Sequence, residues 1–122
     1  MGSMAMKYMT LAAGATTTGG PIWLHPDNIS NISFTTKTGG TLTGTFTVEA
    51  SPDLRARQAS GDTANAEWTD ITATMTGVTN PAGATTEAVA TRTGVPYALV
   101  RLIYTHTSGA GAVDVWFSGQ SS

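Results

Sequence analysis

Residues 42–50 read LTGTFTVEA, and every second residue of this stretch is apolar or small. Leu42, Phe46 and Val48 therefore share one face, while threonine and glutamate side chains occupy the other. Successive side chains of a β-strand point to opposite faces, so this alternation predicts a half-buried antiparallel strand. The stretch places the protein in the β class.

The residues just before this stretch repeat its pattern. NISFTT, at residues 31–36, puts Ile32 and Phe34 on one face. KTGGT, at residues 37–41, then supplies a Gly-Gly turn of the kind that joins paired strands. We therefore expect residues 31–50 to form a β-hairpin.

Further strand candidates follow along the chain, and helical periodicity is almost absent. PYALVRLIYTHT, at residues 96–107, is apolar on both faces, which is typical of a central strand. Additional candidates are PIWL at 21–24, WTDITATM at 68–75, TTEAVATR at 85–92 and VDVWFSG at 113–119. About seven or eight short strands, separated by turns rich in Gly, Pro and Thr, predict an all-β antiparallel sandwich or jelly roll. A closed barrel is the alternative.

The amino-acid composition favours some classes of binding partner and argues against others. Only 11% of the 122 residues are charged, against roughly 25% in ordinary soluble domains. Such a surface suits a protein that neighbouring subunits cover. The net charge of -2 argues against a nucleic-acid partner. No apolar run is long enough to span a membrane, and the absence of cysteine excludes disulfides and thiolate metal sites.

The chain divides into two parts by composition. Residues 1–20 are expected to form a flexible N-terminal arm, because AAGATTTGG at 12–20 is low in complexity and has no apolar face. Residues 1–3, MGS, also fit a remnant of an expression vector. Residues 21–122 are expected to form the sandwich domain. The arm's threonines are candidate partner contacts, namely Thr16, Thr17 and Thr18.

A long polar stretch, LRARQASGDTANAE at residues 54–67, separates two of the strand candidates. Loops of this length in small domains usually carry function or remain mobile. Arg55 and Arg57 suit a contact loop, because arginine is enriched at protein interfaces. We therefore interpret this stretch as a loop that contacts a partner. The alternative is a mobile loop that is surrounded by solvent.

Catalytic groups are scarce. His25 lies next to Asp27 in LHPDN, but neighbouring turn residues usually make local caps, and no G-x-S-x-G elbow supplies a nucleophile. His106 is expected at the surface near a turn. The carboxylates around the long stretch are more consistent with solvated turns than with a cation site; they are Asp53, Asp62, Glu67 and Asp70. We therefore expect no enzymatic activity, no cofactor and no metal.

The aromatic residues allow two interpretations. They could form a platform for stacking sugar rings, or they could pack in the core or at an interface. Packing is the interpretation that we favour. The residues concerned are Trp23, Trp68, Trp116, Tyr97 and Tyr104.

The order of the motifs over about residues 30–119 resembles small β-sandwich proteins of tailed-bacteriophage virions, especially capsid decoration (cement) proteins. The residues that carry the resemblance are Glu49, Ser51, Asp53, Trp68, Ile71, Tyr97, Arg101, Tyr104, Val113, Val115, Trp116 and Phe117. In such proteins a short turn joins the strand that ends near Glu49 to the segment that begins at Trp68. Here residues 54–67 are inserted instead.

The resemblance implies a structural protein that binds the major capsid protein on the outer surface of the virion. It also implies a homo-oligomer, with a trimer favoured, that is made in the host cytoplasm. The alternative is a carbohydrate- or receptor-binding sandwich of a phage tail or fibre. A small hydrolase is the weakest candidate.

Overall fold

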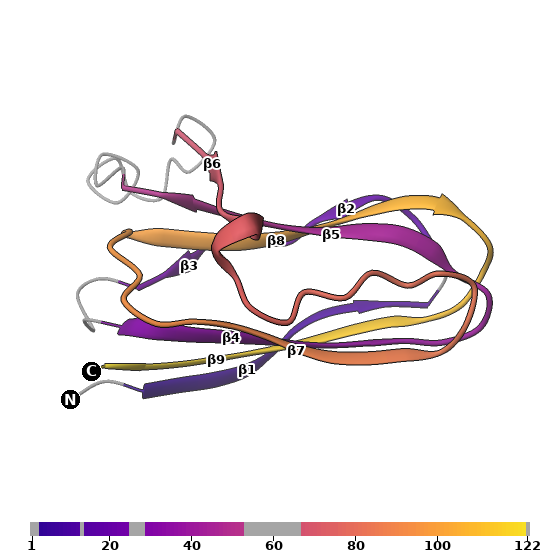
Figure 1. Ribbon diagram of the computed structural model, residues 1–122, viewed down its shortest axis with the longest axis horizontal. Coiled ribbons are helices and arrows are strands. Elements are labelled where there is room, and N and C mark those ends of the chain that lie inside the picture. The colour runs from indigo at the N-terminus through magenta and orange to yellow at the C-terminus, as the bar shows by residue number, and fades with distance from the viewer. Residues whose placement is uncertain (1–2, 13, 25–28, 53–66, 122) are drawn as a thin grey trace.

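The computed structural model describes residues 3–12, 14–24, 29–52 and 67–121. These residues form nine strands and one short 3-10 helix (Figure 1). The elements are β1 (Ser3–Leu11), β2 (Thr17–Thr18), β3 (Ile22–Trp23), β4 (Ile29–Thr38), β5 (Thr43–Ser51), β6 (Thr69–Asp70), η2 (Thr72–Thr74), β7 (Thr86–Arg92), β8 (Leu99–Ser108) and β9 (Val113–Ser121). No helix in this described part is long and apolar enough to cross a membrane.

The strands form two antiparallel sheets that pack face to face as two layers (Figure 1). We call the sheet with the order β1-β9-β4-β7 sheet A, and the sheet with the order β2-β8-β5-β6 sheet B. Strand β3 also pairs with β8, so β2 and β3 are two halves of one edge strand of sheet B. The resulting order is that of an eight-stranded jelly roll. The all-β sandwich predicted from the sequence is confirmed.

The core lies between the sheets and consists of the residues that alternate inward. Phe34 of β4 packs against Phe117 of β9 at 5.2 Å between ring centroids, and Phe46 of β5 packs against Tyr104 of β8 at 5.4 Å. All four aromatic side chains are buried. The inward faces predicted for Ile32 and the apolar residues of 42–50 are therefore correct.

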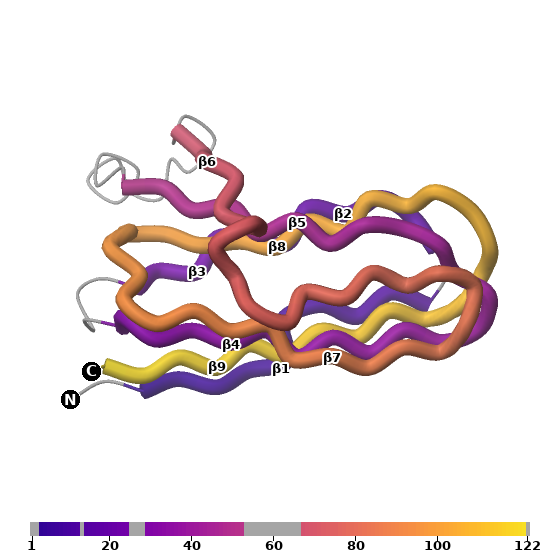
Figure 2. Tube along the Cα trace, viewed as in Figure 1, coloured from indigo at the N-terminus to yellow at the C-terminus, as the bar shows by residue number. Residues whose placement is uncertain are grey.

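The predicted hairpin over residues 31–50 is wrong, because β4 and β5 lie in different sheets. Figure 2 shows the chain crossing between the layers after β4. Strand β4 already has β9 and β7 as neighbours on its two sides, which leaves no edge for β5. The turn residues can reverse the chain within one sheet, which makes a hairpin, or between two sheets, which makes an arch. The alternation predicted which face of each strand is buried, but it did not predict which strand lies next to it in the sheet.

The β4–β5 arch packs against the arch between β8 and β9. Gly39 N donates to Ala112 O at 3.0 Å, and Thr41 N donates to Ala110 O at 2.8 Å. Gly109 has a φ of +81°, and a Cβ atom at this position would overlap the carbonyl oxygen of Thr41. Glycine is therefore required where the two arches approach each other.

The predicted flexible arm over residues 1–20 is also corrected. Ser3–Leu11 forms β1, which pairs with β9 along its length and completes sheet A. A β-bulge shifts the register between Lys7 and Met9. The inward-facing positions are consequently even-numbered before the bulge, as at Met4, and odd-numbered after it, as at Met9. This phase change hides the period-two alternation in the sequence, and the boundary drawn at residue 20 does not separate an arm from the sandwich.

The strand expected over residues 68–75 is shorter than predicted. Only Thr69–Asp70 pairs with β5, and the chain then turns through the 3-10 helix. Ile71 and Met75 are buried as expected, but Ala73 is exposed. Asp70 Oδ1 accepts a hydrogen bond from the backbone N–H two residues later at 2.8 Å. Such local bonds favour turns over continued strand pairing.

Candidate functional site

The contact loop predicted around Arg55 and Arg57 lies outside the described residues, as do His25 and Asp27. The contact function of the two arginines therefore stays a prediction. The other candidate residues can be placed in the fold.

The three candidate threonines lie at the edge of sheet B. Thr17 and Thr18 pair with Tyr104 and Ile103 of β8. The hydroxyl oxygen of Thr16 accepts a hydrogen bond from the backbone N–H of His106 at 2.9 Å. These threonines are thus part of an ordered strand edge, and any partner contact that they make starts from this edge.

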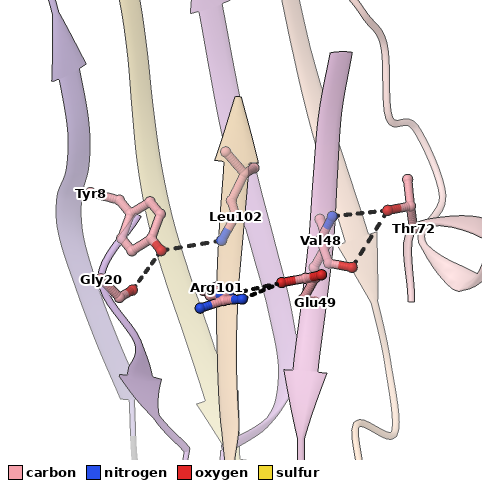
Figure 3. Close-up of polar contacts among 7 residues, drawn as sticks. All are labelled: Tyr8, Gly20, Val48, Glu49, Thr72, Arg101 and Leu102. Carbon is pink, nitrogen blue, oxygen red and sulfur yellow. Dashed lines mark hydrogen bonds and ion pairs between the residues drawn. The ribbon is translucent and has the colours of Figure 1, made fainter. Parts of the chain in front are cut away.

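The edge strand is interrupted between β2 and β3, and Tyr8 of sheet A fills the interruption (Figure 3). The Tyr8 hydroxyl donates to the carbonyl oxygen of Gly20 at 2.6 Å and accepts from the N–H of Leu102 at 3.1 Å. Gly19 leaves room for the ring, since a Cβ atom there would overlap it. One side chain therefore ties the edge of sheet A to the central strand of sheet B.

This environment changes the acidity of the Tyr8 hydroxyl. Burial raises the pKa of Tyr8 to about 12, because the phenolate loses hydration. The hydrogen bond from the backbone of Leu102 and the positive charge of Arg101 act in the opposite direction but do not cancel the effect of burial. The hydroxyl therefore stays protonated at physiological pH, where it is a neutral structural link between the sheets.

The outer face of sheet B carries a cluster of Arg101, Glu49 and Trp68. Arg101 of β8 lies opposite Glu49 of β5. Its Nε donates to Glu49 Oε1 at 2.8 Å, and a terminal nitrogen lies 2.7 Å from the same oxygen (Figure 3). The guanidinium carbon lies 4.0 Å from the centroid of the Trp68 ring. Three residues that carry the phage resemblance thus meet in one charge-neutral, partly buried cluster.

The edge of β5 next to the short β6 is closed by the segment that follows β6. Val48 N donates to Thr72 Oγ1 at 2.9 Å (Figure 3). Ile71 N donates to Val48 O at 2.8 Å. Further along, Phe46 N donates to Asn80 Oδ1 at 2.8 Å. Side-chain oxygens thus accept from the Val48 and Phe46 N–H groups, which are not left open to another chain. No sequence pattern signalled this arrangement.

The outer face of sheet A presents a row of side chains from all four strands. Lys7, Trp116, Thr35 and Val89 follow one another across β1, β9, β4 and β7. Trp116 is 37% exposed and Val89 is 53% exposed. Lys7 Nζ lies 3.0 Å from Asp114 Oδ1 and 5.1 Å from the centroid of the indole. This face combines exposed apolar surface with a paired charge.

A shallow hollow lies on sheet A beside this row, and we call it the Ser118 hollow. Its volume is about 280 Å³. It is lined by Asn31, Ile32, Ser33, Thr91, Arg92, Thr93, Ser118, Gly119 and Gln120. The hydroxyl oxygens of Ser33 and Ser118 are 2.7 Å apart at neighbouring positions of β4 and β9.

The five aromatic residues considered as one sugar platform do not form one. Tyr104 is buried in the core, and Trp68 lies against Arg101 on sheet B. Trp116 lies on the opposite sheet, where it is exposed. Packing was the correct interpretation for Tyr104, whereas Trp116 remains available at the surface.

His106 and Asp70, the chemical candidates that the structure describes, make local contacts. His106 Nδ1 lies 3.2 Å from the hydroxyl of the buried Tyr104, which is a structural contact. No group of three or more histidine and acidic side chains in the described ranges is placed to hold a metal ion. Asp70 is exposed, and hydrogen bonds from the side chain and backbone of Thr72 lower the pKa of its carboxyl group. Asp53 and Asp62 lie outside these ranges.

Comparison with protein-family models, with curated proteins and with solved structures finds no match to this chain. Inference about function therefore starts from the residues and the fold.

Proposed function

We propose that this protein is a structural protein of a tailed-bacteriophage virion, and that it decorates the outer surface of the capsid as a cement protein. Its partners are the major capsid protein and further copies of itself, with a homotrimer as the favoured assembly. Its action is mechanical. Contacts that span neighbouring capsid subunits oppose the separation of these subunits. Because a symmetric oligomer makes the same weak contact several times, its overall binding is strong.

The observation that carries the proposal is the strand order of the two sheets. The order β1-β9-β4-β7 facing β2-β8-β5-β6 is that of a jelly roll, an architecture that recurs in viral capsid proteins. Because a fold alone does not assign a function, the motifs shared with decoration proteins add a second line of support. Glu49, Trp68 and Arg101 belong to those motifs and lie in direct contact on sheet B.

The surface also suits a protein that others cover. Charged residues make up 11% of the sequence, and the two ion pairs among the described residues neutralise four of them. Interfaces are depleted in unpaired charge at their centres. Asn80 and Thr72 already accept from N–H groups on the edge of β5, which disfavours the addition of another strand to sheet B at that edge. Assembly is therefore proposed to use the two outer faces.

Binding to phage heads tests the proposal. Expanded heads that lack their own decoration protein are mixed with the intact protein and sedimented, while light scattering gives the oligomeric state of the free protein. Two variants place a carboxylate on opposite faces: Val89→Asp on sheet A and Thr105→Asp on sheet B, where both side chains are exposed. Point substitutions are preferred to a truncation that starts at Gly20, because the truncation would remove β1 from sheet A.

The proposal predicts saturable binding of the intact oligomer, and a loss of about tenfold or more in affinity for one of the two variants. Both variants should keep the β-sheet circular dichroism spectrum of the parent. A monomer that sediments with none of the heads would contradict the proposal.

A carbohydrate- or receptor-binding sandwich of a phage tail or fibre is the second candidate. The specific observation in its favour is the exposure of Trp116 beside the Ser118 hollow. Saccharide binding without any head binding would favour this candidate over the decoration protein.

A further inference from the structure

Most side chains that line the Ser118 hollow are polar and uncharged, with Ile32 and Arg92 as the exceptions. The residues that face outward from sheet A are recognised by their register, because Ile32 and Gly119 at the intervening positions are buried. The outward-facing members of the lining are Asn31, Ser33, Thr91, Thr93, Ser118 and Gln120. Amide and hydroxyl groups both donate and accept hydrogen bonds. The hollow can therefore satisfy a ligand that presents donors and acceptors side by side.

Trp116 extends the hollow with an aromatic surface. It lies two residues before Ser118 on the same face of β9, which is a separation of roughly 7 Å along a strand. Lys7 contacts the indole, and Asp114 holds the Lys7 ammonium group at 3.0 Å. These contacts restrict the ring before any ligand arrives, which lowers the ordering cost of binding. More than a third of the residue nevertheless stays exposed.

The chemistry of this surface discriminates between classes of ligand. A phosphate group or a nucleic acid would require several cations, and the lining holds a single cation, Arg92, which already donates to Thr74 Oγ1 at 3.0 Å and lies 5.7 Å from the Tyr97 ring. A protein partner would bury an apolar anchor in a pocket, and the one apolar side chain of the lining, Ile32, is already buried in the core. A neutral sugar ring presents hydroxyl groups at its rim and an apolar C–H face that packs on aromatic rings, so it matches both parts of the surface.

The size of the hollow agrees with a short saccharide. Its volume of about 280 Å³ lies just below the roughly 300–1,000 Å³ that ligand pockets span. The hydroxyls of Ser33 and Ser118 use one proton for their mutual hydrogen bond. They retain one donor and further acceptor capacity for a ligand.

We infer that the outer face of sheet A binds a neutral oligosaccharide. Trp116 provides the stacking surface, and the Ser118 hollow receives an adjacent sugar through Asn31, Ser118 and Gln120. The inference does not rest on the proposed attachment to capsids, but it requires that the capsid contacts leave Trp116 and the Ser118 hollow uncovered. It would then give the virion surface an affinity for glycans.

Titration with defined saccharides tests the inference. Neutral hexasaccharides of glucose, mannose, galactose and N-acetylglucosamine are added up to about 5 mM, a range that detects weak binding. Heat release and tryptophan fluorescence are recorded for the full chain. The variants are Trp116→Ala and Asn31→Ala, and the control is Thr105→Ala, which removes an exposed hydroxyl from the opposite sheet. Head binding is measured in parallel, so that failure of one activity is distinguished from failure of the other.

The inference predicts saturable binding of at least one hexasaccharide. Trp116→Ala should weaken it by about tenfold or more, Asn31→Ala should weaken it by about threefold or more, and the control should not change it. All variants should retain the circular dichroism spectrum of the parent. Absence of binding to every hexasaccharide would overturn the inference. Binding that both Trp116→Ala and Asn31→Ala leave unchanged would overturn it equally, because the saccharide would then occupy another surface.

Discussion

The hydroxyl of Tyr8, on the edge strand of one sheet, accepts a hydrogen bond from the backbone N–H of Leu102, in a central strand of the other sheet, at 3.1 Å. The two residues are 94 positions apart in the sequence. Strand pairing holds each sheet together internally, but it does not connect the layers. This contact adds a directional polar link to the apolar core that joins them.

Replacing Tyr8 by phenylalanine should lower the free energy of unfolding by about 1–3 kcal/mol. The substitution keeps the ring but removes the hydrogen-bond partner of the Leu102 N–H and of the Gly20 carbonyl. Urea denaturation measures the effect. The matched control is Tyr97→Phe, a partly buried tyrosine whose ring lies near Arg92, and a change within about 0.5 kcal/mol is expected there. Equal stability of Tyr8→Phe and the parent would refute a structural role for the hydroxyl.

Alkaline pH should destabilise the protein through the same residue. Burial raises the pKa of Tyr8 to about 12 in the folded protein, against 10.0 for a tyrosine exposed to water. The unfolded chain therefore loses the proton first, and the folded state is stabilised less and less as the pH rises from 10 to 12. At about 1.36 kcal/mol per pKa unit, the loss amounts to roughly 2–3 kcal/mol.

Urea midpoints between pH 8 and 12 provide the measurement, with Tyr8→Phe as the control. The variant should lose less stability than the parent over this range. Burial also raises the pKa of Tyr104, so some alkaline loss should persist in the variant. Identical pH profiles for the two proteins would contradict the assignment.

The packing of the two arches predicts unequal effects of two glycine substitutions. Gly109 and Gly83 both have a positive φ, at +81° and +87°. A Cβ atom at Gly109 would meet the carbonyl of Thr41, whereas one at Gly83 would meet open space. Gly83→Ala should cost about 1 kcal/mol from backbone strain alone, and Gly109→Ala should cost about 3 kcal/mol or more. Thermal or urea denaturation compares them, and equal losses would show that the arches do not need their close approach.

The cluster on sheet B predicts that arginine cannot be replaced by lysine at position 101. Arg101 uses two nitrogens toward Glu49 and stacks its planar group on Trp68. Lysine keeps the charge but loses the planar contact and the second nitrogen, so Arg101→Lys should cost about 1 kcal/mol. Urea denaturation measures the loss, and the tryptophan emission should shift to longer wavelength as Trp68 gains water. Unchanged emission and stability would show that the cluster is incidental.

The sequence was most informative about which side chains are buried. Alternation identified Phe34 of β4 and Phe46 of β5 as inward-facing, because a strand with one buried face must repeat every second residue. The same alternation cannot reveal the neighbour of a strand. The Gly-Gly turn therefore indicated a hairpin, whereas the jelly roll places β4 and β5 in opposite sheets.

The candidate surfaces could be predicted less well from the sequence. The bulge beside Tyr8 breaks the phase of β1, so the first strand resembled a disordered arm. Lys7 and Trp116 are distant in the sequence and become neighbours only through the β1–β9 register. The contact loop at residues 54–67 remains a prediction, because Arg55 and Arg57 lie outside the described residues.

Cryo-electron microscopy of expanded heads incubated with the protein tests the decoration function most directly. The account predicts additional density of two-layered sheets at symmetry-related positions on the outside of the shell, with one face or edge of each sandwich against capsid subunits. Heads that stay bare after incubation with saturating protein, across the tailed phages tried, would contradict it.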